Sequence, residues 1–203
     1  LIKGDICPGQ RGRIHKILPA IAILWLAVAS LKIQAMMVVF AIAYFYSQVQ
    51  TKKTRDQGPM WVMYLANGLA LAYVGIVVAE QQSIAAGLSV LVQVLLLGAL
   101  FAHLLLTIAR TRLQAFHRIL PVSGVVAAML MSLAILLKAS GLGDEALMSA
   151  TQPLLIGLAL LLSAIVIWCW HMLMSKEIQK VQLSIALVVV LAATTFNQGL
   201  FVL

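Results

Sequence analysis

Residues 17–49 read ILPAIAILWLAVASLKIQAMMVVFAIAYFYSQV, and the way this stretch crosses a membrane decides the fold. It is mostly apolar, with a short polar interruption, Lys32-Ile33-Gln34, near its middle. Because a transmembrane helix needs about 20 apolar residues, the stretch is long for one span and short for two. It is therefore either one long helix or a tight hairpin of two helices, 17–31 and 33–49.

Five further apolar segments follow this stretch, and each approaches or exceeds the length that crosses a bilayer. They cover residues 59–79, 84–109, 118–138, 152–174 and 181–203. Of the 203 residues, 63% are hydrophobic and 10% are charged, whereas soluble domains carry about 25% charged residues. We therefore expect an all-α, polytopic transmembrane helix bundle that occupies residues 1–203 as a single integral membrane domain.

The basic residues decide between one long helix and a hairpin. With a hairpin, 12 of the 14 Lys and Arg residues fall on one side of the membrane. These are Lys3, Arg11, Arg13, Lys16, Lys52, Lys53, Arg55, Arg110, Arg112, Arg118, Lys176 and Lys180. One long helix would instead move Lys52, Lys53 and Arg55 to the opposite side. Because loops rich in Lys and Arg stay in the cytoplasm, we predict the hairpin, with the basic loops on the cytoplasmic side. The hairpin gives seven helices in this chain. We also expect the membrane to be a bacterial-type inner membrane.

Charge and cysteine usage argue against two other classes of site. The net charge of +8 resides in short loops between apolar segments, so we expect membrane lipids and no nucleic acid as partners. Cys7 and Cys169 lie far apart in the sequence, and neither has a CxxC neighbour. We therefore predict no metal site and no cofactor.

A five-residue sequence occurs twice, once before each of two apolar segments. His15-Lys16-Ile17-Leu18-Pro19 recurs as His117-Arg118-Ile119-Leu120-Pro121. In both places we expect the proline near the start of a helix, where its missing N–H costs least. Either membrane-entry sequences have converged, or the chain contains an internal repeat with halves of about 1–83 and 84–203. A repeat predicts another helix before His15 and hence eight helices in the full protein.

Polar side chains inside the apolar segments are candidate site residues, because placing them in hydrocarbon is costly. They are Asn67, Tyr73, Gln93, His103, Ser163, His171, Asn197 and Gln198. Each of them has a plainer role as a hydrogen-bonding group between helices. All four histidines fall toward the predicted cytoplasmic side, which makes that side the place to look for a site.

With these features the chain resembles the YhhN-type lysoplasmalogenases, eight-helix membrane proteins that cleave the vinyl-ether bond of lysoplasmalogens. The sequence His15–Pro19 resembles the entry into the second helix of that family. Asn67 and Tyr73 fall where the family shows a histidine followed by a tyrosine. Ser163 takes the place of the serine of a Ser-Asp pair, and Gln198 resembles the glutamine of an Ala-Gln pair.

This resemblance implies a site for a lysophospholipid-like substrate in a cavity open to the cytoplasm. The implied catalytic residues are His171, Gln198, Asn67 and Tyr73, and the implied substrate-binding residues are Ser163, Asn197, His103 and Gln93. Two family carboxylates are missing, since Phe45-Tyr46 lies near the place of a Gly-Asp pair and Ala164 replaces the other aspartate. Without these general acids the ether-bond hydrolase needs another proton donor, and His103 or His171 would have to serve.

Two other functions are compatible with the sequence. A small-solute transporter or channel built from parallel repeats would border its aqueous path with Gln93, Asn67 and Asn197. A non-catalytic structural or sensory membrane protein would use the same residues to hold its helices together. The sequence leaves the substrate and the oligomeric state open.

Overall fold

The computed structural model describes residues 8–49, 58–109, 114–174 and 177–202. In this part of the chain every regular element is a helix. The elements are α1 (Pro8–His15), α2 (Leu18–Leu31), η1 (Ile33–Ala35), α3 (Met36–Gln48), α4 (Met60–Ala79), α5 (Ile84–Ile108), α6 (Gln114–Ala139), α7 (Asp144–Leu173) and α8 (Lys180–Val202). The described residues divide into two compact units, which are residues 8–77 with Ala109 (unit 1) and residues 78–108 with 114–202 (unit 2).

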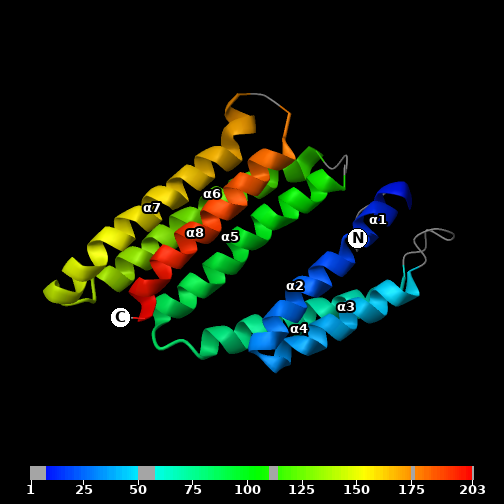
Figure 1. The fold of residues 1–203 in the computed structure, drawn as a ribbon, viewed down its shortest axis with the longest axis horizontal. Helices are drawn as coiled ribbons and strands as arrows, with labels where there is room; N and C mark the ends of the chain where they lie inside the picture. Colours follow the sequence, from blue (N-terminus) through cyan, green and yellow to red (C-terminus); the bar gives the residue numbers. More distant parts are fainter. Residues whose placement is uncertain (1–7, 50–57, 110–113, 175–176, 203) are drawn as a thin grey trace. The chain divides into compact units, whose positions relative to one another are not determined.

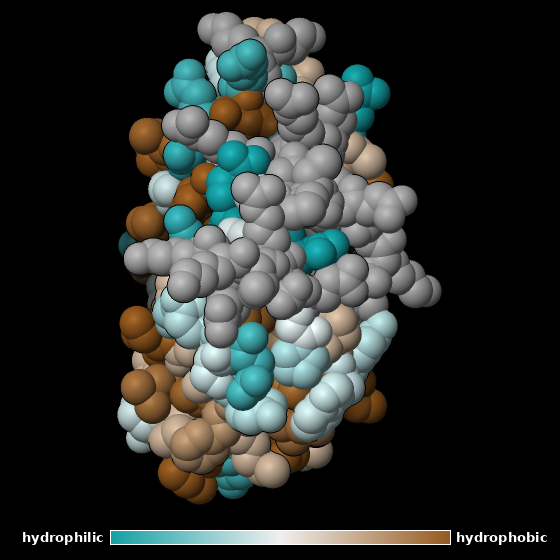
Figure 2. Space-filling model, turned by 90° about the vertical axis from the view of Figure 1, so that its right-hand side faces the viewer, coloured by the Kyte–Doolittle hydropathy of each residue, from teal (hydrophilic) through white to brown (hydrophobic). Residues whose placement is uncertain are grey.

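The helices have the length and composition of membrane spans. Within the described ranges, six helices are long and apolar enough to cross a bilayer, and Ile33–Gln48 forms a shorter apolar helix. On the face drawn in Figure 2, hydrophobic residues reach the surface between hydrophilic ones. The prediction of a polytopic helical membrane protein is therefore confirmed. Seven basic residues that predicted the orientation lie outside the described residues, so the sidedness stays a prediction: Lys3, Lys52, Lys53, Arg55, Arg110, Arg112 and Lys176.

The stretch 17–49 forms two helices that separate at the predicted place. α2 ends at Leu31, and Lys32 has an extended backbone with φ −137° and ψ 109°. The short 3₁₀ turn η1 then leads into α3. The beginning of the first span differs from the prediction, because helical structure starts at Pro8 in α1 and a candidate span runs from Arg11 to Leu31. Hydropathy detects only the apolar part of a helix, so it missed the polar turns that precede it.

Unit 1 packs α2, α3 and α4 around a small apolar core. Val38, Ile42 and Phe45 of α3 are buried against Leu18 of α2 and Val62 of α4. A second contact joins the rings of Trp25 in α2 and Tyr73 in α4, whose centroids are 5.6 Å apart in an edge-to-face arrangement. Such aromatic pairs contribute beyond the area that they bury.

Unit 2 is a bundle in which α5, α6, α7 and α8 run side by side (Figure 1). Leu96, Leu100, Ile135, Leu183 and Val190 lie fully buried in its core. Close approach of the helices depends on two glycines, as expected for helix packing in membranes. A Cβ atom at Gly124 would lie 2.0 Å from Cζ3 of Trp168, and one at Gly157 would lie 2.2 Å from Oδ1 of Asn197. α6 and α7 therefore hold these two side chains of unit 2 in fixed places.

The two prolines of the repeated sequence take different positions, and the prediction is wrong for one of them. Pro19 lies in the first turn of α2, as expected. Pro121 lies inside α6, because this helix already begins at Gln114 rather than at residue 118. Membrane helices tolerate an internal proline where a neighbouring group satisfies the carbonyl that the proline leaves free.

Candidate functional site

Three histidines and one tryptophan come together at one end of unit 2, and we call this group the histidine site. His103 comes from α5, His117 from α6, and Trp168 and His171 from α7. His103 and Trp168 are fully buried, His171 is buried, and His117 is half-buried. The site lies near the end of α5, the start of α6 and the end of α7, which are neighbouring ends in an up-and-down bundle.

A directed chain of hydrogen bonds runs through the site. Nε1 of Trp168 donates to Nδ1 of His103 over 2.9 Å, and Nε2 of His103 lies 3.0 Å from Nδ1 of His117. An indole N–H can only donate, so Nδ1 of His103 must be the acceptor. His103 then carries its proton on Nε2 and donates it to Nδ1 of His117. His117 is left with its own proton on Nε2.

His171 differs from the other two histidines because both its nitrogens face backbone carbonyl oxygens. Nδ1 lies 2.9 Å from the Trp168 oxygen, and Nε2 lies 3.4 Å from the His117 oxygen. Its ring centroid is 5.6 Å from that of His103. Because a carbonyl oxygen only accepts, a proton on either nitrogen of His171 has a place to bond. The His117 contact is the longer of the two, so a proton on Nε2 is the more weakly held.

Gln182 of α8 completes the support of the site. Its Nε2 donates to the Ile167 oxygen over 2.6 Å and lies 3.4 Å from the Trp168 oxygen. The amide thus ties α8 to the segment of α7 that carries Trp168 and His171. All four helices of unit 2 therefore contribute to the histidine site or to its support.

Among the residues that the structure describes, the histidine site is a hydrogen-bonded network of an indole and imidazoles. In the described part of the chain, no group of three or more His, Cys, Asp or Glu residues is placed to hold a metal. Both nitrogens of His103 are already used in hydrogen bonds within the site. A chain of imidazoles with assigned donors and acceptors can fix a tautomer and move a proton at its exposed end.

Some of the candidate residues from the sequence lie in the histidine site, and others lie elsewhere in unit 2. His103 and His171 meet as members of one cluster. Gln198 is exposed near the far end of α8, about 24 Å along the helix from Gln182 at 1.5 Å per residue. Ser163 is exposed and donates its hydroxyl to the Ala159 oxygen over 2.8 Å.

Two more predicted residues lie in unit 2, away from the imidazoles along their helices. Gln93 is half-buried on α5, ten residues before His103. Asn197 is buried against Gly157, with an exposed fraction of 1%. Its Oδ1 has no hydrogen-bond partner among the described residues. These positions fit the plainer role of contacts between helices better than a shared substrate site.

The remaining predicted residues belong to unit 1. Asn67 is exposed on α4, and Tyr73 is half-buried against Trp25. The proposed set of His171, Gln198, Asn67 and Tyr73 is therefore divided between the two units.

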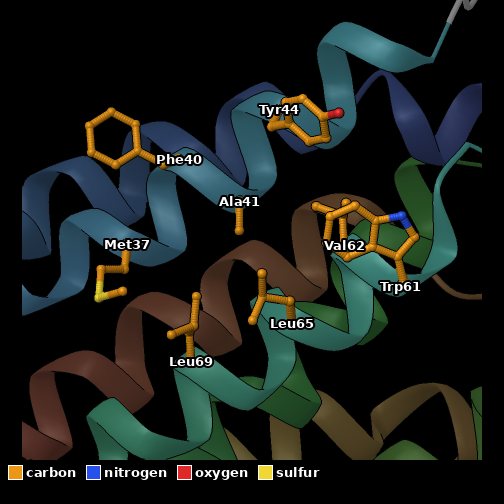
Figure 3. A pocket seen from close by; sticks show the side chains of 8 residues that line it. All are labelled: Met37, Phe40, Ala41, Tyr44, Trp61, Val62, Leu65 and Leu69. Atoms are coloured by element: carbon orange, nitrogen blue, oxygen red, sulfur yellow. The ribbon is translucent and has the colours of Figure 1, made fainter.

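A groove in unit 1 is a second candidate, and it lies between α3 and α4 (Figure 3). Its volume is about 310 Å³. The lining residues are Met37, Phe40, Ala41, Tyr44, Trp61, Val62, Leu65 and Leu69. None of them is a histidine, a carboxylate or an amine, so the groove offers mainly shape and apolar surface, with the Tyr44 hydroxyl as its ionisable group.

Three residues of this group were not among the candidates that the sequence offered. His117 was noted only as part of the repeated sequence, and neither Trp168 nor Gln182 was a candidate site residue. The repeat was the available signal, because it placed a histidine four residues before a proline at His117. Which side chains that histidine would meet depends on the rotation of α5 and α7, which a single sequence does not reveal.

Comparison with known proteins places the chain in a family without assigning an activity. Residues 1–197 match a family described as an integral membrane domain. An uncharacterized protein of Haemophilus influenzae is 30% identical over 145 residues, which is 66% of this chain and 54% of that relative. The chain thus spans about half the length of the curated relative that it matches. No solved structure matches the chain.

Proposed function

The chain belongs to this integral membrane domain family, and we propose that it is a membrane-embedded hydrolase that uses the histidine site on a single-chain lipid. The reaction we propose is hydrolysis of the vinyl-ether bond of a lysoplasmalogen. The observation that supports it most is the hydrogen-bonded chain from Trp168 through His103 to His117, with His171 beside it. This cluster offers acid–base groups in place of the aspartates that lysoplasmalogenases have and this chain lacks.

The depth of the site suits this substrate. His103 lies five residues before the end of α5 and His171 lies two residues before the end of α7. At 1.5 Å per residue these distances are roughly 8 Å and 3 Å along the helices. The vinyl ether of a lysoplasmalogen joins the alkenyl chain to glycerol, so it lies at the boundary between hydrocarbon and headgroups. We expect a buried imidazole close to a helix end to lie at that depth.

The chemistry requires one proton donor and one proton acceptor, and His171 can be both. The protonated ring gives the proton on Nε2 to the vinyl carbon farther from the ether oxygen. A water then attacks the carbon that bears this oxygen, and the neutral Nε2 takes the proton that the water loses. The resulting hemiacetal breaks its bond to the glycerol oxygen and passes its hydroxyl proton to that oxygen. The products are a fatty aldehyde and the free glycerol hydroxyl.

The other members of the site assist without changing their bonds. His117 presents a proton on Nε2, which can bond the attacking water or the hemiacetal oxygen. His103 keeps His117 in this tautomer by donating to its Nδ1. Trp168 in turn keeps His103 in its tautomer. Such orientation of a reacting group by fixed neighbours is a general feature of acid–base sites.

Aldehyde release from a lysoplasmalogen by the purified protein in lipid nanodiscs tests the proposal. We expect His171→Gln to lower the rate by about 10²-fold or more, as for the loss of a general acid. His15→Gln is the matched control, because His15 lies in unit 1 and belongs to the other copy of the repeated sequence. No aldehyde above background from the unaltered protein overturns the proposal. Equal rates for both variants overturn the role of His171.

A further inference from the structure

Pro121 removes a hydrogen bond from the interior of α6 at one carbonyl. In an α-helix the carbonyl oxygen of residue 117 accepts from the N–H of residue 121. Residue 121 is a proline and lies inside α6, so it has no N–H to donate. The His117 oxygen is therefore left without its regular helical partner.

The ring of His171 lies against this same oxygen. Nε2 of His171 is 3.4 Å from the His117 oxygen, while Nδ1 is 2.9 Å from the Trp168 oxygen. The contact crosses from α7 to α6 and joins residues that are 54 positions apart. The lone pair that an N–H of residue 121 would occupy is open to a donor from another helix. The proline and the histidine thus meet at one atom, although neither is near the other in sequence.

The groups around His171 do not compete for this proton. His103 of α5 is occupied on both nitrogens, by Trp168 and by His117. Gln182 of α8 approaches the Trp168 oxygen with a neutral amide donor. Among described charged residues near the helix ends, Arg118 and Lys180 are exposed. The free carbonyl is therefore the acceptor that faces Nε2 of His171.

We propose that Pro121 is a positioning residue, which keeps the His117 carbonyl open so that it holds a proton on Nε2 of His171. The use of that proton in vinyl-ether hydrolysis rests on the proposed function, whereas the hydrogen bond does not. When the ring is protonated, Nδ1 donates to the Trp168 oxygen over 2.9 Å and Nε2 donates to the freed His117 oxygen over 3.4 Å. The two contacts fix the plane of the ring, and the transferable proton on Nε2 is in the longer, weaker bond.

Replacing Pro121 with alanine tests this role, because it restores an N–H that competes for the His117 oxygen. Pro153→Ala is the matched control, since Pro153 also lies inside a helix, α7, and its freed carbonyl belongs to Ser149. The measurement is ¹⁵N NMR of histidine-labelled protein in nanodiscs across a pH series, with the His171 signals assigned from His171→Gln. We expect Pro121→Ala to change the protonated Nε2 signal of His171 and Pro153→Ala to leave it unaltered.

The outcomes separate this inference from the proposed function. An unchanged His171 spectrum in Pro121→Ala overturns the inference. If Pro121→Ala does not fold, the spectrum of the unaltered protein tests the inference instead. Absence of a proton on Nε2 of His171 at every pH of the series overturns the inference as well. If the spectra are as expected but no aldehyde is released, the positioning role of Pro121 is supported and only the proposed reaction is overturned. If the reaction occurs, we expect Pro121→Ala to slow it about tenfold, as for the loss of one hydrogen bond.

Discussion

The sequences His15–Pro19 in unit 1 and His117–Pro121 in unit 2 differ only in Lys16 against Arg118, yet they fold differently. In unit 1 the helix breaks, since α1 ends at His15, a turn follows at 16–17, and α2 begins at Leu18. In unit 2 the same pattern stays inside α6 without a break. A proline four residues after a histidine is thus compatible with both a helix start and a continuous helix.

The two histidines also differ in what surrounds them. His15 is buried, with 2% exposed, whereas His117 is half-buried. The ring centroids of His15 and Phe45 are 5.6 Å apart in an edge-to-face arrangement. Nε2 of His15 has no hydrogen-bond partner in the part of the chain that the structure describes. His117 instead receives a hydrogen bond from His103. The entry sequence thus positions a histidine, while helices distant in sequence give it a chemical environment.

Replacing His103 with phenylalanine should produce the largest difference between the two units. It removes the acceptor of Trp168 Nε1 and the donor to His117 Nδ1, so two groups lose their partners. We expect the free energy of unfolding in mixed micelles to fall by about 3 kcal/mol. His15→Phe, which removes an unpartnered nitrogen, should be neutral or stabilising by comparison. Equal losses of unfolding free energy in His103→Phe and His15→Phe would contradict this difference between the two histidines.

Adding a methyl group at Gly124 should disturb unit 2 by a smaller amount. The new Cβ would lie 2.0 Å from Cζ3 of Trp168, so the indole must shift and its bond to His103 must lengthen. Overpacking of this kind costs about 1–3 kcal/mol, which a shift of the thermal midpoint in detergent would report. Gly98→Ala on α5 serves as the control, because no atom lies within 4 Å of its added Cβ. A midpoint that does not fall in Gly124→Ala would show that Trp168 has room to move.

The smallest effect is expected at Gln182. Gln182→Leu removes the bonds to the Ile167 and Trp168 oxygens, which both belong to helical backbone. We expect a loss of about 1 kcal/mol in SDS titrations, in line with hydrogen bonds between membrane helices. Gln179→Leu, at an exposed position just before α8, should change nothing measurable. Equal midpoints for the two variants would remove Gln182 from the support of the site.

Much of the fold was predictable because membrane spans obey local rules. The polar interruption at Lys32 indicated where α2 ends, and the lengths of the apolar segments predicted the helices α4 to α8. The helix starts were less predictable, since the polar α1 precedes the apolar α2, and α6 and α7 begin at Gln114 and Asp144, ahead of the predicted apolar segments. In the site, His103 and His171 were identified as polar groups within apolar helices, and their roles as partners were not. The repeated sequence was the local signal for His117, and Gln182 had none.

By itself the sequence determined that this protein crosses a membrane several times and that its helices separate at Lys32. The reason is that hydrocarbon thickness sets helix length and every backbone group must bond within its own helix. Tertiary structure alone decided which of two nearly identical segments became part of a site. That choice depended on how α5, α6 and α7 are rotated and how closely Gly124 lets Trp168 approach. Both depend on contacts between residues far apart in the chain, which no local pattern specifies.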